Sequence, residues 1–442
     1  MPITSLRLKN FKCFADTEET QLAPLTVVFG RNNAGKSSLL QGLALLRQTL
    51  DNPQENQRLA LEGTLYPAGS YADLVHGHRK TDHISIAIGV KTLAAAGSVE
   101  FEFTCDDLVQ SPKLVRMGIL MRGQAPVELR RGVGYSGPFV LFIDRKRQGY
   151  SKAADFHFPA SGILPIIGSN PTKVGRPSRT QDRARKKAPL LLSALEKELR
   201  GIRAVGSFRA QPERTYGLKS PSVETVDITG ADVVQALIAD STAPRKRGNL
   251  VHAVNRWLKV IGRVRILQLR SSSRGRRSYE VRMKDLDSGR WAHFCDVGFG
   301  IGQALPVVVE GLRTPASGTF VVQEPEIHLH PDAQLAMADF LIDLVLSGKR
   351  VIVETHSENL LLRIRHRILT AAGNGRRGSS LAPSDVAVIQ VDRAGKGESK
   401  VRTIGVDDLG QMADWPSGFM QEANDERMKI LHEMGDRMEK AR

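Results

Sequence analysis

The chain has 442 residues, of which 41% are hydrophobic and 25% are charged, a composition typical of globular proteins with two or three domains. No apolar run approaches the roughly 18 residues that predict a membrane-spanning helix, and no apolar segment of a signal peptide follows the first basic residues. Three distant cysteines, Cys13, Cys105 and Cys295, favour reduced thiols over a disulfide framework or a zinc site. We therefore expect a cytoplasmic protein without a membrane partner.

The net charge of +16 is concentrated in the middle of the chain. Residues 144–290 contain 31 Lys and Arg against 13 Asp and Glu, a net charge of +18, so the rest of the chain sums to −2. Uneven charge of this kind favours a polyanion partner such as DNA. The alternative is a solvated basic surface that only keeps the protein in solution, because charge attracts phosphate without reading a sequence.

The N-terminal region predicts two strands followed by a helix. Residues Ile3–Phe11 alternate in polarity around Leu6, and Pro24–Phe29 are nearly all apolar, as in a parallel sheet that helices cover on both faces. Leucines recur at helical spacing over Ser37–Leu50.

The middle of the chain predicts a β-rich part and then helices. The strands expected first are His83–Val90, Ser98–Phe103, Leu114–Met121 and Pro138–Ile143. Residues 145–187 are poor in core residues and peak in charge at Arg183–Lys187, so we expect a loop or a partly disordered arm there. The elements expected next are helices at Leu190–Arg200, Ala231–Ile238 and Leu250–Ile261 and strands at Arg263–Leu269 and Ser278–Met283. An α/β pattern returns over Asp296–Ser357, and a strand at Val386–Val391 and a helix from about Ala423 to Ala441 complete the chain.

A phosphate-binding loop is predicted at Gly30–Ser37, which has the pattern G-x4-G-K-S between an apolar strand and a helix. Glycines let backbone N–H groups surround a phosphate, and the helix N-terminus adds a partial positive charge. In this pattern Lys36 contacts the β- and γ-phosphates and the Ser37 hydroxyl binds Mg²⁺. A Gly-rich turn that merely caps a helix is the alternative. The residues expected to bind ATP here are Asn32, Asn33, Ala34, Gly35, Lys36, Ser37 and Ser38.

Two later strands end in polar clusters that suit phosphoryl transfer to water. The apolar run Thr319–Val322 leads into Gln323-Glu324-Pro325-Glu326, where Glu324 is our candidate for orienting and deprotonating the attacking water. The buried run Val351–Val353 leads to His356, which we expect to contact the γ-phosphate. A strand that ends at the surface in acidic residues, and a structural histidine, are the alternatives.

A second glycine-rich nest lies at Gly298–Gln303, just before an apolar run. One nucleotide does not need two phosphate nests in one chain, whereas two chains placed head to tail do, so the nest predicts a homodimer or a higher homo-oligomer. A flexible loop is the alternative.

These motifs together resemble the ABC ATPases of the RecF/SMC/OLD superfamily, in particular short AAA-type ATPases without long coiled coils, several of which occur in bacterial anti-phage and mobile-element loci. The motifs in order are L-x-L-x-N-F, G-R-N-N-A-G-K-S, G-F-G-I-G-Q, Q-E-P-E-I-H-L-H-P and E-T-H-S. The segments Gly206–Tyr216 and Trp415–Met420 also resemble that branch. The resemblance covers both ends of the chain well and residues 100–290 only thinly.

The resemblance implies a role for each motif. Gly30–Ser38 is then the Walker A loop, Glu324 the catalytic glutamate, and His356 the switch histidine, with Lys36 also catalytic. The signature nest would bind the partner's ATP through Gly298, Gly300 and Gln303. His330-Pro331-Asp332 resembles the D-loop, and Asp73–His76 is the best match to the Q-loop.

The sequence departs from the family pattern at two positions. Gln323 stands where the Walker B aspartate is usual, so the metal ligands implied are Ser37 and an uncharged Gln323. Gly298 stands where the signature serine is usual, which removes a hydroxyl from the trans γ-phosphate. Either change predicts slow hydrolysis or a protein that mainly clamps ATP.

The expected fold is an α/β ABC-ATPase P-loop head, split in sequence by an inserted β-rich and helical domain. We expect head segments at 1–90 and 291–410, a basic insert at 91–290 and a tail at 411–442. The expected function is an ATP- and Mg²⁺-dependent, DNA-linked sensor or clamp in anti-phage defence or DNA repair, with a separate effector such as a nuclease. An ATP-dependent oligomeric scaffold that regulates a protein effector is the alternative, and the basic middle segment disfavours a transporter subunit.

Overall fold

The computed structural model describes residues 3–54, 57–79, 81–93, 95–105, 111–132, 139–147, 156–158, 162–167, 179–217, 227–242, 249–273, 276–373, 380–395, 397–412, 426 and 428–434. The strands are β1 (Ile3–Phe11), β2 (Phe14–Asp16), β3 (Thr20–Gln21), β4 (Leu25–Phe29), β5 (Ile84–Lys91), β6 (Ala96–Cys105), β7 (Pro112–Met121), β8 (Val127–Arg131), β9 (Phe139–Ile143), β10 (Lys146–Arg147), β11 (Phe156–His157), β12 (Ile166–Ile167), β13 (Ile202–Val205), β14 (Tyr216–Gly217), β15 (Val264–Ser273), β16 (Arg276–Asp285), β17 (Trp291–His293), β18 (Thr319–Gln323), β19 (Arg350–Glu354), β20 (Val386–Ala394) and β21 (Glu398–Ile404). The helices are α1 (Lys36–Asp51), α2 (Tyr71–Leu74), α3 (Arg179–Arg200), α4 (Val233–Thr242), α5 (Asn249–Gly262), α6 (Phe299–Arg313), α7 (Pro331–Leu346) and α8 (Glu358–Gly373), with short 3-10 turns that include η1 (His76–His78).

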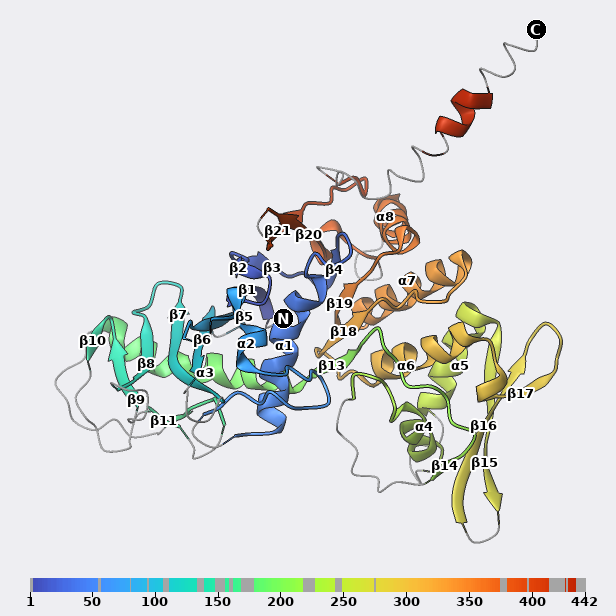
Figure 1. Cartoon of the computed structure of the whole chain (residues 1–442), viewed down its shortest axis with the longest axis horizontal. Coiled ribbons are helices and arrows are strands. Elements are labelled where there is room, and N and C mark those ends of the chain that lie inside the picture. The colour runs from blue at the N-terminus through green and yellow to red at the C-terminus, as the bar shows by residue number, and fades with distance from the viewer. Residues whose placement is uncertain are drawn as a thin grey trace.

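An antiparallel sheet forms one side of the molecule (Figure 1). Its strand order is β10-β9-β8-β7-β6-β5-β1-β2, with β3 also paired to β1. The strands alternate between buried apolar residues and polar ones, as in β5 and β6, because only one face packs on the core. The four strands predicted between residues 83 and 143 are confirmed.

A second, mostly parallel sheet lies in the centre of the molecule, with strand order β13-β18-β19-β4-β20-β21. Strands β4 and β19 are buried along their whole length, since helices or the other sheet cover both faces. The carboxyl ends of β4, β18 and β19 meet at one edge of this sheet, which is where parallel sheets bind ligands. This α/β arrangement confirms the predicted fold class.

Alternate residues of the parallel strands pack into two separate cores. On one side, Val28, Val321 and Ile352 join α1, α3 and the antiparallel sheet. On the other, Val27 and Val353 join helices α4 to α8, so Figure 1 shows these helices and the antiparallel sheet on opposite sides of the parallel sheet. The parallel sheet is therefore the middle layer of the fold.

Strand β13 joins the parallel sheet although it lies within the range predicted as an insert. Residues Ile202–Val205 pair in parallel with Thr319–Val322 of β18. The range 91–290 is thus not wholly separate from the head, because one of its strands completes the head sheet. The domain boundaries at residues 90, 290 and 410 stay a prediction.

The basic run Arg183–Lys187 lies in helix α3, so the expectation of a loop or a disordered arm was wrong for this part of residues 145–187. Ala184, Ala188 and Leu191 are all buried and recur at helical spacing. They continue the apolar stripe of the predicted helix at Leu190–Arg200 by nearly two turns towards its N-terminus, and the basic residues between them obscured this pattern in the sequence.

A smaller sheet has the strand order β14-β16-β15, with β17 paired to β16. Strand β14 precedes α4, and the other three strands follow α5. It confirms the two strands predicted around residues 263–283. Within the described part of the chain, no helix is long and apolar enough to cross a membrane. Residues Met428–Met434 are helical and exposed, whereas Trp415–Met420 lie outside the described residues.

Candidate functional site

The turn between β4 and α1 can be made only with glycine at two positions. Gly30 has φ of +149°, and a Cβ there would lie 2.1 Å from the carbonyl oxygen of Val391. Gly35 has φ of +101°, and a Cβ there would lie 2.2 Å from Sγ of Cys13. The predicted loop therefore has the tight backbone that lets N–H groups approach a phosphate closely.

The side chains of the predicted loop differ in exposure. Asn32 and Asn33 are exposed, Ala34 is buried, and Ser37 and Ser38 are half-buried at the start of α1. Exposed loop residues next to half-buried hydroxyl groups suit a nucleotide that lies on the loop, although the structure does not test their binding.

Lys36 is a buried cation at this loop. Its Nζ donates to the carbonyl oxygens of Gly30 at 3.1 Å and of Arg31 at 3.0 Å. Burial lowers the pKa of Lys36, and the nearby carboxylates of Glu354 and Glu324 oppose that shift. A lysine held here between carboxylates and the loop carbonyls can contact phosphate oxygens in the loop.

A hydrogen-bonded chain joins Ser37, Glu354 and Gln323 at the carboxyl ends of the parallel strands. The Ser37 hydroxyl donates to Oε1 of Glu354 at 2.7 Å, and Nε2 of Gln323 donates to Oε2 of Glu354 at 3.0 Å. Glu354 is only 4% exposed, and burial raises the pKa of its carboxyl while the Ser37 hydrogen bond opposes the shift. The structure thus brings together both predicted metal ligands, with a carboxylate between them that the sequence analysis did not assign.

Glu324 and His356 face each other beside this chain. His356 Nε2 lies 3.5 Å from Oε1 of Glu324. Burial lowers the pKa of His356, and the charge of Lys36 lowers it further, so the imidazole is neutral near pH 7. Glu324 has φ of +45°, and its backbone N–H donates to the carbonyl oxygen of Glu354 at 2.7 Å. A carboxylate and a neutral imidazole so placed can orient a water molecule and accept its proton.

Glu326, which the sequence analysis left without a role, ties the two strand ends together. Its Oε1 accepts hydrogen bonds from the Thr355 hydroxyl and from the His356 backbone N–H, both at 2.7 Å. Burial raises the pKa of Glu326, since the carboxyl is almost fully enclosed. Its position two residues after Glu324 on a buried strand end was the only sequence signal for it.

Arg209 is a second residue that the sequence analysis did not assign. Its guanidinium is buried behind the end of β18 and donates to four backbone carbonyl oxygens, those of Gly206 (3.0 Å), Gln303 (3.2 Å), Gln323 (2.7 Å) and Glu324 (2.9 Å). Burial lowers the pKa of Arg209 to about 10, which leaves it charged at pH 7. Arg209 lies in Gly206–Tyr216, which resembles the family, but no motif rule singles it out.

The predicted signature nest forms the N-terminus of α6, with Gly298 as its N-cap. A Cβ at Gly300 would lie 2.5 Å from the carbonyl oxygen of His328, so this glycine allows the helix to approach the segment before α7. Phe299 is half-exposed and contacts the His328 ring edge-on, with ring centroids 4.7 Å apart. Gln303 is only 4% exposed, so its side chain lies inside the protomer, which does not support nucleotide binding through that side chain.

A broad pocket of about 960 Å³ opens beside this nest. It is lined from α5, the start of α6 and the segment His328–Ala333. His330 and Asp332 of the predicted D-loop are both exposed there. Behind them, Gln334 on α7 accepts a hydrogen bond from the Ser357 hydroxyl at 2.7 Å, which connects the predicted D-loop helix to the segment that carries His356.

The predicted Q-loop, Asp73–His76, spans the end of α2 and the start of η1. His76 Nδ1 lies 2.8 Å from the carbonyl oxygen of Lys12, one residue from Cys13, which packs on Gly35. This places the segment one layer behind the phosphate loop, and its assignment stays a prediction.

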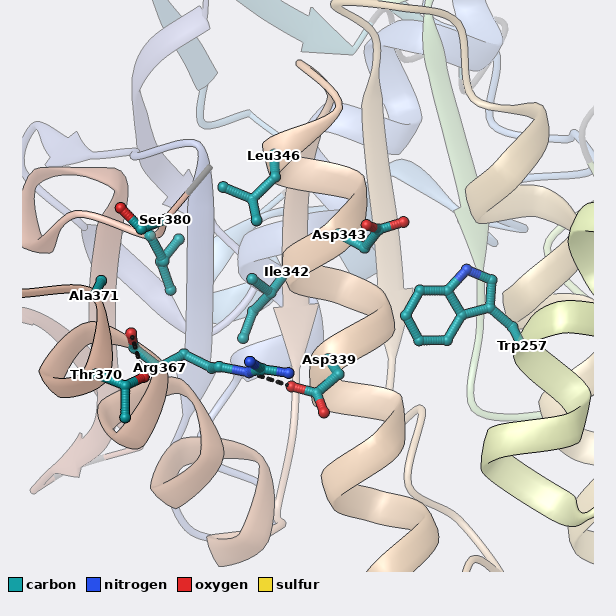
Figure 2. A pocket seen from close by; sticks show the side chains of 10 residues that line it. Trp257, Asp339, Ile342, Asp343, Leu346, Arg367, Thr370, Ala371 and Ser380 are labelled. Atoms are coloured by element: carbon teal, nitrogen blue, oxygen red, sulfur yellow. Dashed lines mark hydrogen bonds and ion pairs between the residues drawn. The ribbon is translucent and has the colours of Figure 1, made fainter. Parts of the chain in front are cut away.

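A separate pocket of about 580 Å³ lies between α5, α7 and α8 (Figure 2). Asp339 and Arg367 form an ion pair of 2.7 Å on one side of it, and Trp257 lies on the other. None of the predicted site residues lines this pocket.

The donor set at the strand ends suits Mg²⁺, a hard cation that binds oxygen ligands. The hydroxyl of Ser37 and the buried carboxylate of Glu354 are adjacent oxygen donors, and the amide oxygen of Gln323 is a third donor nearby. These residues are suited to hold Mg²⁺ together with a nucleotide at the phosphate loop.

Comparison with known families agrees with this geometry. The profile of the AAA ATPase domain matches residues 1–91 and 258–361. These ranges include the phosphate loop, the signature nest and the strand ends of β18 and β19. The chain carries an ABC-type ATPase domain. Its sequence is split in two, as the resemblance to the RecF/SMC/OLD superfamily predicted, and the segment between the matched ranges holds α3, β13 and α4.

The ATPase domain is also similar to solved SMC head structures. An SMC head domain from Thermotoga maritima has a TM-score of 0.43 and 11% identity, covering 92% of this chain and 100% of that chain. The Smc head domain with an extended coiled coil bound to the C-terminal domain of ScpA derived from Pyrococcus furiosus has a TM-score of 0.44 and 13% identity, covering 98% and 100%. No curated protein sequence matches this chain.

Proposed function

We propose that this chain binds ATP with Mg²⁺ at the loop Gly30–Ser37 and hydrolyses it. The observation that carries the proposal is the meeting of Lys36, Ser37, Glu324 and His356 at the carboxyl ends of β4, β18 and β19, where Glu324 and His356 lie 3.5 Å apart.

Each residue has a defined task in this proposal. The backbone N–H groups of Asn33 to Lys36 surround the phosphates, and Lys36 neutralises their charge. Mg²⁺ held by Ser37, Gln323 and Glu354 would supply further charge neutralisation at the phosphates. Glu324 accepts the proton of the attacking water, and His356 orients that water and donates to the γ-phosphate.

We further propose that two protomers place their nucleotides between them. The nest at Gly298 opens on an exposed surface with Phe299, His330 and Asp332, beside the broad pocket. Backbone N–H groups at the N-terminus of α6 are suited to contact the γ-phosphate that the partner holds. ATP then stabilises a homodimer because each nucleotide contacts both protomers.

DNA is the partner that the charge favours. The basic run Arg183–Lys187 lies on α3, where Arg183 is exposed. Arg203, Arg214 and Arg263 form ion pairs with acidic residues. We therefore expect phosphate contacts from α3 rather than from the whole basic segment, and binding that weakens steeply with salt. A role in anti-phage defence or DNA repair, with a nuclease as a separate chain, follows from the family resemblance.

The first test is steady-state ATP hydrolysis by the purified chain with and without duplex DNA. Hydrolysis that DNA stimulates, and that Glu324→Gln abolishes, supports both parts of the proposal. Hydrolysis that is indifferent to DNA supports the ATPase and contradicts the DNA link, and it would favour a scaffold with a protein effector. No hydrolysis above that of Glu324→Gln contradicts the ATPase itself.

The dimer has its own test. Light scattering of Glu324→Gln should show a doubled mass with ATP and Mg²⁺ and a single protomer with EDTA. A mass that does not change with ATP would contradict the proposed nucleotide-bridged pair.

A further inference from the structure

The carboxylate that the family pattern places at the end of β18 lies one strand away in this chain. Gln323 occupies the last position of β18, and its register partner on the parallel neighbour β19 is Glu354. Adjacent strands lie about 4.8 Å apart, a distance that side chains from either strand end can span. A carboxylate on β19 can therefore reach the point that a carboxylate on β18 would reach.

The contacts of Glu354 direct it to the nucleotide loop. Oε1 accepts from the hydroxyl of Ser37, the residue whose hydroxyl is expected to bind Mg²⁺, and Oε2 accepts from the amide of Gln323. Glu354 is 4% exposed, and the positive charge of Lys36 stabilises its ionised form. A carboxylate buried this far is costly unless a cation or hydrogen bonds compensate for its charge.

The other carboxylates at this edge are engaged elsewhere. Glu326 accepts hydrogen bonds from Thr355 and from the backbone of His356. Glu324 faces the His356 imidazole. Among the described residues at this edge, Glu354 is the carboxylate hydrogen-bonded to Ser37.

We propose that Glu354 supplies the acidic Mg²⁺ ligand of this ATPase, directly or through the water shell of the ion, and that Gln323 is a positioning residue whose amide orients it. The inference rests on the proposed nucleotide function. A carboxylate on β19 in place of one on β18 explains why Gln323 can be uncharged, because the negative charge stays at the same edge of the sheet.

The test is equilibrium binding of a fluorescent ATP analogue, mant-ATP, to the full chain, measured in EDTA and in Mg²⁺. All proteins carry Glu324→Gln so that hydrolysis does not consume the ligand. In this background Mg²⁺ is expected to tighten binding at least tenfold. Adding Glu354→Gln should reduce that gain to less than threefold and leave the EDTA affinity within about twofold, since the loop itself is unchanged.

A swapped variant separates the role of charge from that of shape. Gln323→Asp combined with Glu354→Gln returns the carboxylate to β18 and is expected to restore at least half of the Mg²⁺ gain, measured as the logarithm of affinity. Electron paramagnetic resonance of bound Mn²⁺ provides a readout that does not depend on nucleotide fluorescence, and Glu354→Gln should weaken Mn²⁺ binding by the same factor.

The outcomes distinguish this inference from the function on which it rests. If Glu354→Gln keeps the full Mg²⁺ gain, Glu354 is only a structural acceptor and the inference is wrong while the ATPase stands. If the Glu324→Gln background binds no mant-ATP, or if Mg²⁺ does not tighten its binding, the proposed nucleotide function is contradicted, and the inference that rests on it is contradicted as well. If Glu354→Gln does not fold, Glu354→Asp takes its place. In that variant, the factor by which Mg²⁺ tightens mant-ATP binding should be at least threefold smaller than in the Glu324→Gln background. An unchanged factor would again overturn the inference.

Discussion

The buried guanidinium of Arg209 provides a sharp test of how the catalytic strand end is held in place. We consider Arg209→Met, which keeps an unbranched side chain but removes the charge and every donor. The side chain is buried, with the residue 8% exposed, and its four acceptors are backbone carbonyl oxygens. The substitution therefore leaves buried acceptors without this donor.

The size of the effect follows from those acceptors. A buried polar group left without its partner costs about 1–3 kcal/mol. Gln323 and Glu324 lie at the end of β18, where the strand pairing stops, so their carbonyl groups have the fewest alternative donors. We expect a loss of about 2–6 kcal/mol in the free energy of unfolding, on the basis of two such groups. For a chain of this length that melts as one unit, the melting temperature should fall by roughly 2–6 °C.

The assay is thermal unfolding, with hydrogen exchange of the backbone amides of residues 324, 326 and 327 as the local readout. Arg214→Met is the matched control, because Arg214 is 69% exposed at its side chain and pairs with the exposed Asp296. An exposed ion pair contributes little, so this control should move the melting temperature by less than about 1 °C. Equal shifts in the two variants, or unchanged exchange at residues 324, 326 and 327, would refute the argument that Arg209 holds this turn.

Three further predictions concern single positions. Gly35→Ala should reduce affinity for mant-ATP at least tenfold, because its Cβ would meet Cys13 and its φ is +101°; an affinity like that of the unchanged chain would show that the loop can relax. Gly298→Ser should be tolerated, since φ there is −50° and no atom lies within 4 Å of an added Cβ. The substitution should strengthen ATP-dependent dimerisation measured by light scattering, and weaker dimerisation would contradict the proposed nest. Glu326→Gln should raise the melting temperature at pH 8, because burial raises the pKa of Glu326 and makes its ionised form unfavourable in the folded state. That advantage should disappear as the pH falls below 4.5, the ordinary pKa of a glutamate, where the carboxyl becomes protonated in both states, and a difference that does not vary with pH would exclude the carboxyl as its cause.

The motifs on the parallel sheet could be predicted because each is local in sequence. The loop Gly30–Ser37 and the strand ends at Glu324 and His356 each follow directly after an apolar strand, so the motif and its strand can be recognised within one short stretch of sequence. The class of fold followed from the same segments, and the ATPase domain is confirmed by the family match.

The parts that could not be predicted depend on pairing across the fold. Glu354 is next to Gln323 only because β18 and β19 are parallel and in this register. Arg209 acts through backbone carbonyls, which leave no trace in side-chain patterns. The N-terminal half of helix α3, before the predicted helix at Leu190–Arg200, was missed because charged residues separate its buried alanines. Strand β13 was assigned to the insert because four residues carry too little signal.

The position of β4 also has a consequence for synthesis of the chain. Leu25–Phe29 is a fully buried strand that lies between β19 and β20, so both of its partners are made more than 320 residues later. At about 5–20 residues per second, a ribosome leaves this strand without either neighbour for roughly 15–65 s. The antiparallel sheet, whose strands mostly pair with their neighbours in sequence, can form during that interval. Because β1 is part of that sheet and precedes β4 with only the short strands β2 and β3 between them, its early folding would anchor the nascent buried strand and limit its encounters with other unfinished chains.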